Sequence, residues 1–373
     1  MTSDSTYDLV VVGAGVFGLW VAKRAVEAGM RVALVEKNSV GSGASATPLG
    51  ALTAHSPDRW NAKKQFQLDA LIELSDEIDR LEDETGVLTG YRRCGRVMPI
   101  RSDAFLAQLP ARSEGARAHW DGRSYEVVRN APSGDWLDAA AAPLGYVHDT
   151  LAARISARRY TRALADWLAS RATLLEGVGY EGWADAARLS DGRRLATGAV
   201  VLAHGVGVFD AIRDLTGAEI GRGSPGRVAL ARIRTASDLD LSARPLIYDG
   251  GAYIVPQGVD TVSLGGFDDY DGHPTTVRSE VDPRFARLVA LCPRLDGAEI
   301  LQWWAGVRPK CRLRDPLVGK APVDGPIWLA AGGFKIGLGV AHRLASALIA
   351  EINGAAGPRV PETFGIQHHF GRS

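Results

Sequence analysis

A glycine-rich turn close to the N-terminus constrains the fold of this chain more than any other feature of its sequence. An apolar run of strand length, residues 8–12, leads into Gly13, Gly15 and Gly18, which have the spacing G-x-G-x-x-G. A helical segment follows, and a second apolar run then ends in an acid, Glu36. This order of strand, turn, helix, strand and acid is typical of a dinucleotide-binding βαβ unit in a doubly wound sheet.

Each part of this motif has a physical role. Gly13 permits the tight turn out of the strand, Gly15 lets the backbone approach a pyrophosphate, and Gly18 lets the helix pack closely on the sheet. Amide groups at the helix N-terminus carry partial positive charge and stabilise phosphates. Glu36 lies near the position at which an acid accepts hydrogen bonds from ribose hydroxyls. The motif predicts a bound dinucleotide and leaves open whether it is FAD or NAD.

Composition places the chain among ordinary globular proteins. Its 373 residues exceed the usual size of one hydrophobic core, so we expect two domains. Lys and Arg total 43, as do Asp and Glu, and this balance gives no reason to expect a nucleic-acid partner. The first seven residues are polar, and no apolar run reaches the roughly 18 residues of a membrane span. We therefore expect a cytoplasmic protein without a signal peptide or a membrane span.

The cysteines and histidines show no metal-binding pattern. Cys94, Cys292 and Cys311 form no C-x-x-C pair, and such sparse cysteines are typical of reduced thiols. The eight histidines form no H-E-x-x-H motif. We predict no metal site.

Local patterns predict several elements along the chain. Residues 19–29 should form the first helix, with Gly29 just past its end. Ser56 and Pro57 resemble a helix start, and an apolar stripe continues that helix to Glu84. We also predict a short helix at 103–109, a helix capped by Ser156 that runs to Arg171, a hairpin at Asp191 and Gly192, and a C-terminal helix ending near Ile352.

Nucleotide-binding segments alternate along the chain with β-rich segments, so we expect discontinuous domains. Residues 1–86, 149–221 and 306–373 are predicted to form the nucleotide-binding domain. Residues 87–148 and 222–305 are predicted to form a substrate-binding α+β domain on a mostly antiparallel sheet.

A second glycine-rich turn, residues 332–339, follows the last predicted strand and precedes the C-terminal helix. A helix N-terminus aimed at the cofactor would stabilise negative charge there. A reduced flavin carries such charge, whereas a nicotinamide cofactor does not. The turn therefore favours FAD over NAD, although glycines that only pack a strand–helix junction would look the same.

Five segments in one order resemble the FAD-dependent amine and amino-acid oxidases of the D-amino-acid oxidase superfamily. They are residues 13–18, 43–55, 199–205, 304–309 and 330–337. Within this superfamily the chain resembles glycine oxidases most and sarcosine oxidases next. The likeness extends over nearly the whole chain. The first segment is common to FAD and NAD proteins, whereas W-A-G-V-R-P followed by the terminal glycine turn is much more specific.

The resemblance implies a Rossmann-like FAD-binding domain of the glutathione-reductase type and a set of cofactor contacts. Val16 and Phe17 would pack along the pyrophosphate, Glu36 and Lys37 would hold the adenosine ribose, and the backbone of Val178 would contact adenine. The further contacts that it implies are Ala44, Ser45, Leu49, Gly50 and Ala51 along the pyrophosphate and flavin, Ala203 and Gly205 after the middle strand, and Gly333, Phe334, Lys335, Ile336, Gly337 and Leu338 at the flavin's pyrimidine edge.

Three residues are expected to meet the substrate. Arg308 matches the arginine that pairs with the substrate carboxylate in glycine oxidases, and a planar guanidinium suits that role. Tyr253 matches a tyrosine over the substrate pocket. Lys335 stands where glycine oxidases have arginine and sarcosine oxidases have lysine, and it would hold the flavin edge or a carboxylate. The structural alternatives are a surface-paired arginine for Arg308 and a half-buried strand aromatic for Tyr253.

The segment after Arg308 departs from the family pattern. Arg312 and Arg314 would make the pocket mouth cationic if they pointed inward, which favours an acidic or dicarboxylic substrate; a solvated basic loop is the alternative. Cys311 is near, but not at, the position where sarcosine oxidases attach FAD covalently, and we expect a plain thiol. The histidines in cofactor-proximal segments, His55, His204 and His342, are expected to be structural.

The expected activity is FAD-dependent oxidation of the C–N bond of an amino acid or secondary amine. Hydride transfer to flavin N5 would give an imine, and O2 would reoxidise the flavin to give hydrogen peroxide. Four alternatives stay open: an NAD-dependent dehydrogenase, a flavin dehydrogenase of an amino or 2-hydroxy acid that passes electrons to a quinone or carrier, a tailoring enzyme for a larger amine, and a non-catalytic FAD-binding scaffold. The sequence leaves the oligomeric state open, a homo-oligomer included.

Overall fold

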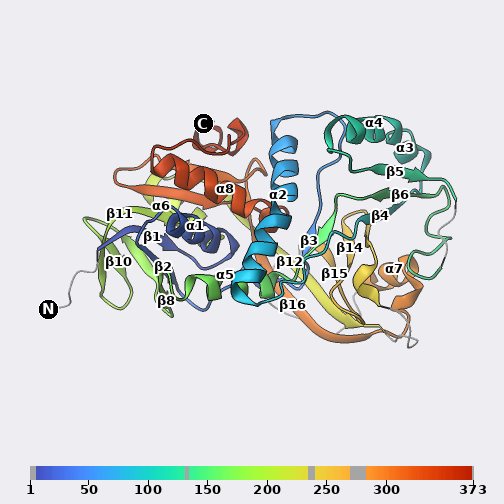
Figure 1. The fold of residues 1–373 in the computed structure, drawn as a ribbon, viewed down its shortest axis with the longest axis horizontal. Coiled ribbons are helices and arrows are strands. Elements are labelled where there is room, and N and C mark those ends of the chain that lie inside the picture. Colours follow the sequence, from blue (N-terminus) through green and yellow to red (C-terminus); the bar gives the residue numbers. More distant parts are fainter. Residues whose placement is uncertain (1–5, 131–133, 234–239, 269–282, 372–373) are drawn as a thin grey trace.

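Two large sheets organise the molecule, one on each side of a long central helix. The computed structural model describes residues 6–130, 134–233, 240–268 and 283–371. Each large sheet has eight strands, and they lie at the left and right of Figure 1. The central helix, α2 (Ala62–Thr85), passes between them. Among the described residues, no helix combines the length and the apolar character needed to cross a membrane.

The first sheet is built from the apolar runs that the sequence predicts. Its main path is β17 (Leu317–Lys320), β18 (Ile327–Ala331), β11 (Arg194–Leu202), β1 (Thr6–Val12), β2 (Val32–Glu36) and β8 (Thr173–Glu176). All neighbours on this path are parallel except β17 and β18. The central residues Val10 and Val11 are fully buried, as expected for strands covered on both faces.

A hairpin extends the first sheet. The strands β9 (Tyr180–Trp183) and β10 (Ala187–Leu189) pair antiparallel and join β11. Gly192 has φ 84°, a left-handed conformation that glycine adopts without strain, in the turn between β10 and β11. The hairpin predicted at Asp191 and Gly192 is therefore confirmed.

Helices cover the two faces of the first sheet. α1 (Val16–Glu27), α5 (Ala157–Leu168) and α8 (Gly337–Ile352) share one hydrophobic core with α2. α6 (Gly207–Thr216) contributes to the core on the other face. A last short helix, α9 (Ile366–Phe370), ends the described chain near β17. The first sheet is thus a layer between helices.

Two predicted helix starts are wrong. α1 begins at Val16, three residues before the predicted start, because Gly15 of the glycine-rich turn is itself the N-cap. α2 begins at Ala62, not at Ser56. Arg59 has φ 50°, which a continuing right-handed helix excludes, and the Asn61 side chain instead caps the helix by accepting from the Lys64 amide at 3.1 Å.

The second sheet is mostly antiparallel. Its order is β16 (Glu299–Cys311), β12 (Gly221–Arg232), β15 (Thr261–Asp268), β14 (Ala252–Pro256), β13 (Leu246–Asp249), β4 (Arg96–Pro99), β6 (Tyr146–Asp149) and β5 (Tyr125–Val128). Only β4 and β13 are parallel neighbours among these described strands. A separate two-stranded ribbon, β3 (Ala51–Leu52) with β7 (Ala153–Arg154), completes the sheets.

Three helices accompany the second sheet: α3 (Asp103–Leu106), α4 (Leu109–His119) and α7 (Pro283–Leu291). The sequence analysis predicts α3 but misses α4, whose buried residues are only Leu109 and Ala116, so its apolar stripe is weak. β16 is one continuous strand through residue 306, where the sequence analysis places a domain boundary. The long β12 and β16 strands extend from the second sheet toward the first (Figure 1).

Candidate active site

The first glycine-rich turn has no room for side chains at two positions. A Cβ atom on Gly13 would lie 2.5 Å from the His204 Cα atom, and Gly13 itself has φ 101°. A Cβ atom on Gly18 would lie 1.7 Å from the Gly13 carbonyl oxygen. The first turn of α1 therefore packs directly on the turn that leaves β1. This close packing is the geometry for which the G-x-G-x-x-G motif selects glycine.

A short segment after β2 closes over the start of α1. The Val16 amide donates to Ser45 Oγ at 3.0 Å, and Ser45 belongs to a single helical turn at Ala44–Ala46. A Cβ atom on Gly15 would lie 3.3 Å from the same oxygen. The structure thus brings the predicted residues Gly15, Val16 and Ser45 together. Small side chains and helical amide groups at this point fit a pyrophosphate.

Glu36, the acid at the end of β2, lies beside the first glycine-rich turn. Glu36 accepts from the Ala14 amide at 2.8 Å and from the Asn38 amide at 2.9 Å. Val178 lies beside it, because its amide donates to the Glu36 carbonyl at 3.0 Å. That bond occupies the Val178 amide, so a backbone contact to adenine would use its carbonyl. Lys37 is exposed next to Glu36.

The segment after β11 lies against the first turn. The Ala203 amide donates to the Val12 carbonyl at 2.8 Å, and Gly205 has φ 67°. His204 lies between these two residues in the sequence, and burial lowers its pKa. His204 is therefore neutral at pH 7 and acts as a packing partner of Gly13.

The two glycine-rich turns meet at one aromatic ring. A Cβ atom on Gly333 would lie 2.5 Å from the ring of Phe17, and one on Gly337 would lie 3.2 Å from it. The ring of Phe17 is therefore wedged between the N-termini of α1 and α8. Segments more than three hundred residues apart therefore contact each other, and we call this junction of the two turns the cradle. Leu338, in the first turn of α8, is half-buried.

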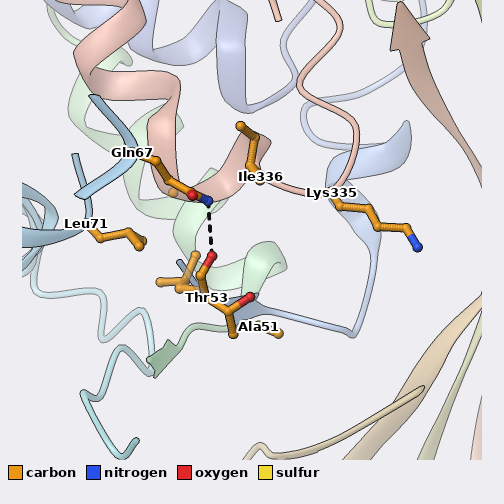
Figure 2. A pocket seen from close by; sticks show the side chains of 8 residues that line it. Ala51, Thr53, Gln67, Leu71, Lys335 and Ile336 are labelled. Carbon is orange, nitrogen blue, oxygen red and sulfur yellow. Dashed lines mark hydrogen bonds between the residues drawn. The ribbon is translucent and has the colours of Figure 1, made fainter. Parts of the chain in front are cut away.

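A small pocket lies beside the second turn. Its lining is Ala51, Leu52, Thr53, Gln67, Leu71, Lys335, Ile336 and Gly339. Figure 2 shows the Gln67 amide donating to the Thr53 carbonyl, at 3.0 Å, while the Lys335 side chain extends away from both. The predicted residues Ala51, Lys335 and Ile336 thus border one space.

Gln67 also holds the neighbouring histidine. Its Oε1 accepts from the His55 amide at 2.9 Å and contacts the His55 ring nitrogen. Burial lowers the pKa of His55, although the Gln67 contact opposes this effect. In α8, burial lowers the pKa of His342 to about 3, with Arg24 and Arg343 adding to the effect. Both histidines are uncharged at pH 7.

Three glycines lie on the face of the second sheet that points to this cradle, so three positions of that face carry no side chain. Gly226 and Gly306 are direct partners on β12 and β16, and Gly265 on β15 pairs with both Val228 and Tyr253. We call Gly226, Gly265 and Gly306 the glycine row. The side chain of Leu49 would lie 3.2 Å from a Cβ atom on Gly265, so this predicted cofactor residue reaches the sheet. Gly50 follows it, and a Cβ atom there would strike the Ile155 carbonyl.

The guanidinium of Arg308 lies against one glycine of this row, Gly226. A Cβ atom on Gly226 would be 2.8 Å from that guanidinium. Arg308 Nη2 donates to the Pro225 carbonyl at 3.0 Å, and its Cζ lies 5.2 Å from the centre of the Phe334 ring. Trp304 uses Gly306 in the same way, since a Cβ atom there would be 2.3 Å from the indole. The glycines therefore set where these two large side chains lie.

Tyr253 joins the second sheet to the pocket. Its hydroxyl lies 3.2 Å from Thr53 Oγ1, and its ring centre is 4.6 Å from that of Tyr248 on β13. Arg96 lies under this pair, 5.5 Å from the Tyr248 ring, and forms a buried ion pair with Asp149 at 2.6 Å. Burial alone would lower the pKa of Arg96, but the Asp149 carboxylate raises it above its usual value. The tyrosine pair therefore rests on a fixed charge.

Four residues near the site are not predicted from the sequence: Tyr248, Arg96, Asp149 and Lys310. Tyr248 and Asp149 carry no motif, and Arg96 is an ordinary strand residue until the register places it under Tyr248. Lys310 Nζ lies 5.2 Å from the Phe334 ring. Its spacing of two residues from Arg308 is the one signal that could have placed it on the same face, and only if this segment had been recognised as a strand.

The segment after β16 is the solvated basic loop that the sequence analysis gives as the alternative to a cationic pocket mouth. Arg312 and Arg314 are exposed, and Arg314 has φ 67° in the turn. Asp315 is buried and pairs with Lys63 of α2 at 2.6 Å. Cys311 is fully buried, and burial raises the pKa of its thiol to about 12. A buried neutral thiol fits the expectation of a plain cysteine.

The described residues hold no cluster of three or more His, Cys, Asp or Glu side chains that could bind a metal. A path of contacts runs from Glu36 through Ala14 to Gly15 and Ser45, and the Phe17 ring continues it to Gly333 near the N-terminus of α8. This path fits a long dinucleotide with negative charge at its middle.

Comparisons with known proteins agree with this geometry. The family model described as DAO, FAD dependent oxidoreductase, matches residues 8–348. Glycine oxidase of Pseudomonas aeruginosa is 26% identical over 353 residues, which cover 88% of this chain and 90% of that protein. Glycine oxidase of Geobacillus kaustophilus is 25% identical over 358 residues, with 89% of each chain covered.

A solved structure shows the same fold. The crystal structure of glycine oxidase from Geobacillus kaustophilus matches with a TM-score of 0.83 at 22% identity, over 98% of this chain and 100% of that one. The mixed α/β architecture of this chain is therefore that of a known fold. Because the family model covers most of its length, the chain belongs to the family of FAD-dependent oxidoreductases.

Proposed function

We propose that this protein oxidises the C–N bond of a small amino acid or secondary amine to an imine, which water then hydrolyses. Bound FAD would supply the acceptor for the hydride that the substrate loses. The observation that carries the proposal is the position of Arg308. Its guanidinium lies between the glycine row and Phe334 of the second glycine-rich turn. A carboxylate held there would place the neighbouring C–N bond beside the cradle.

Arg308 would bind the substrate carboxylate with two parallel hydrogen bonds. Pro225 and Phe334 hold the guanidinium from two sides, and Gly226 lies beneath it. A guanidinium held in this way loses little further side-chain freedom on binding and orients a carboxylate in one plane. The substrate then reacts from a fixed position, which is where much of an enzyme's rate advantage arises.

Tyr253 and its neighbours would close the pocket against water. The Tyr253 hydroxyl meets Thr53 across the gap between the two sheets, and Tyr248 packs on its ring. The lowered pKa values of His55 and His204 leave both rings neutral. Hydride loss from a neutral amine requires no protein base at the Cα proton, so this chemistry needs no charged histidine.

We propose the cofactor contacts on the same grounds. Glu36, with Lys37 and Val178, would hold the adenosine end, and Val16 and Ser45 would hold the pyrophosphate. The second glycine-rich turn, including Lys335, would stabilise negative charge on the flavin. The remaining predicted contacts would lie along the same path.

We propose that the pieces predicted as the nucleotide-binding domain hold FAD and that residues 87–148 and 222–305 complete the substrate site. The cytoplasmic location stays a prediction from composition, which cell fractionation would test.

An anaerobic screen tests the reaction. The FAD-loaded protein is mixed with glycine, sarcosine, D- and L-amino acids and 2-hydroxy acids, and loss of the visible absorbance of oxidised flavin is recorded. We expect amines to bleach the flavin and 2-hydroxy acids to leave it oxidised. Bleaching by no amine would refute the proposed reaction. Reoxidation by air, compared with reoxidation by a quinone, then separates an oxidase from a dehydrogenase.

The variant Arg308→Leu tests the site. Because it removes one partner of a desolvated charge pair, substrate affinity should fall about a hundredfold while FAD stays bound. The matched control is Arg314→Leu, which removes an exposed arginine six residues away and should leave the affinity unchanged. Equal substrate affinity in wild type and Arg308→Leu would refute the role of Arg308.

A further inference from the structure

Basic side chains from two segments gather around the ring of Phe334. The ring centre lies 5.2 Å from Arg308 Cζ, 5.2 Å from Lys310 Nζ and 5.5 Å from Lys335 Nζ. The Phe334 amide donates to the Pro309 carbonyl at 3.1 Å, so the ring is tied to β16 between the two basic residues of that strand. The aromatic face stabilises the cations that approach it.

The register of β12 and β16 places these charges on the substrate side of the sheet. Arg308 and Lys310 are two residues apart, so they share the face that carries the glycine row. The residues opposite them on β12 are Ser224 and Arg222, and Arg222 adds a further basic side chain. Lys310 is only half-buried, yet its ammonium group lies at the ring that Arg308 also contacts.

The two β16 cations differ in what they can do. Arg308 is held in one orientation and suits one carboxylate in a fixed plane. Lys310 is a point charge on a flexible stem, so it can meet a second anionic group at a range of distances.

We propose that the substrate is an amine with two carboxylates, of which Arg308 binds the one next to the reacting C–N bond and Lys310 binds the other. This inference rests on the proposed function, because it names the substrate class of the same site. It moves the basis for an acidic substrate from Arg312 and Arg314, which are exposed, to Lys310.

Binding of ligands that cannot be oxidised tests the inference apart from catalysis. Propionate, butyrate, succinate and glutarate are titrated into the FAD-loaded protein, and dissociation constants are read from the change in flavin absorbance. We expect the dicarboxylates to bind about tenfold more tightly than monocarboxylates of similar length. In Lys310→Met this preference should disappear, while the affinity for monocarboxylates stays within about twofold. Lys310→Arg should restore the preference, because it restores the charge.

The matched control is Lys320→Met, which removes an exposed lysine of β17 and should retain the full preference. Sulfite provides a second readout, because it adds to the oxidised flavin and reports positive charge beside the ring. Sulfite affinity should be unchanged in Lys310→Met. A fall in sulfite affinity as large as the fall in dicarboxylate affinity would mean that Lys310 serves the flavin, and it would overturn the inference.

The outcomes separate the two proposals. Equal affinity for mono- and dicarboxylates in wild type, or a preference that survives Lys310→Met, overturns the dicarboxylate inference and leaves amine oxidation standing. A preference that depends on Lys310 supports the inference about binding. If no amine then bleaches the flavin in the anaerobic screen, only the proposed reaction fails.

Discussion

At Gly13 and Gly18 of the first glycine-rich turn an added Cβ atom would strike backbone, whereas at Gly226 and Gly306 of the glycine row it would strike side chains. A Cβ atom on Gly18 would lie 1.7 Å from the Gly13 carbonyl oxygen, and the two could separate only if α1 moved away from β1. Gly226 instead borders the guanidinium of Arg308, and Gly306 borders the indole of Trp304. Glycine therefore serves the fold in one region and the placement of a functional group in the other.

This difference predicts which changes damage the fold and which damage only the site. The first turn is a continuous piece of sequence whose geometry follows from backbone sterics. The glycine row is assembled from three strands, and its role depends on the register that aligns Gly226 with Gly306. Substitutions in the two regions should separate along that line.

The largest effect is expected for Gly18→Ala. The added methyl group overlaps the Gly13 carbonyl, so we expect a loss of about 3 kcal/mol or more of folding free energy and little bound FAD. Thermal unfolding of the apoprotein and the flavin content after purification measure these effects. A Gly18→Ala protein with wild-type stability would refute the claim that the fold requires glycine in the first turn.

Gly15→Ala is the matched variant within the same turn. Its Cβ atom would lie 3.3 Å from Ser45 Oγ, and Gly15 has φ −79°, so the backbone conformation suits alanine. We expect a change of less than about 1 kcal/mol in stability but at least tenfold weaker FAD binding, because the methyl group enters the proposed pyrophosphate path. Unchanged FAD affinity would place the pyrophosphate elsewhere.

A smaller effect is expected for Gly226→Ala. The neighbouring atoms belong to the end of the Arg308 side chain and not to backbone, so the added methyl group would displace the guanidinium and the fold should be nearly unaffected. The shifted guanidinium no longer meets the carboxylate in its plane, and substrate affinity should fall about tenfold. Titration with substrate or a carboxylate ligand measures this fall. Gly179→Ala, whose Cβ atom would make ordinary contacts in a distant hairpin, is the control.

The smallest effect is expected for Tyr253→Phe. The ring and its packing on Tyr248 stay, and only the contact with Thr53 at 3.2 Å is lost. We expect about 1 kcal/mol, or roughly a fivefold change, in substrate affinity or turnover. A double-mutant cycle with Thr53→Val measures the coupling between the two side chains. Additive effects in that cycle would show that the hydroxyl contact contributes nothing to the site.

Much of the fold could be predicted because the relevant signals are local. The apolar runs that form β1 and β2 and the spacing of Gly13, Gly15 and Gly18 need no distant partner to be interpreted. The errors lie where local signals compete. Ser56 and Pro57 resemble a helix start, but the backbone at Arg59 delays α2 until Asn61 can cap it.

The candidate site could be predicted only in part. Arg308 and Tyr253 lie in segments that match the family pattern. The Tyr253 hydroxyl contacts Thr53 of the pocket, and Arg308 contacts Phe334 of the second glycine-rich turn. Lys310, Tyr248 and the Arg96 and Asp149 pair carry no motif. Their importance follows from strand pairing, which joins residues that are far apart in sequence.

The sequence by itself determined that a dinucleotide is held and that the chain resembles amine and amino-acid oxidases, because backbone sterics and glycine spacing act over short stretches. Only the tertiary structure decided which charged groups share a site. Alternation along β16 puts Arg308 and Lys310 on one face, and its pairing with β12 aligns that face with the glycine row. The contact of both side chains with Phe334 brings them to the second glycine-rich turn. Side-chain charges act through space, and the fold sets those distances.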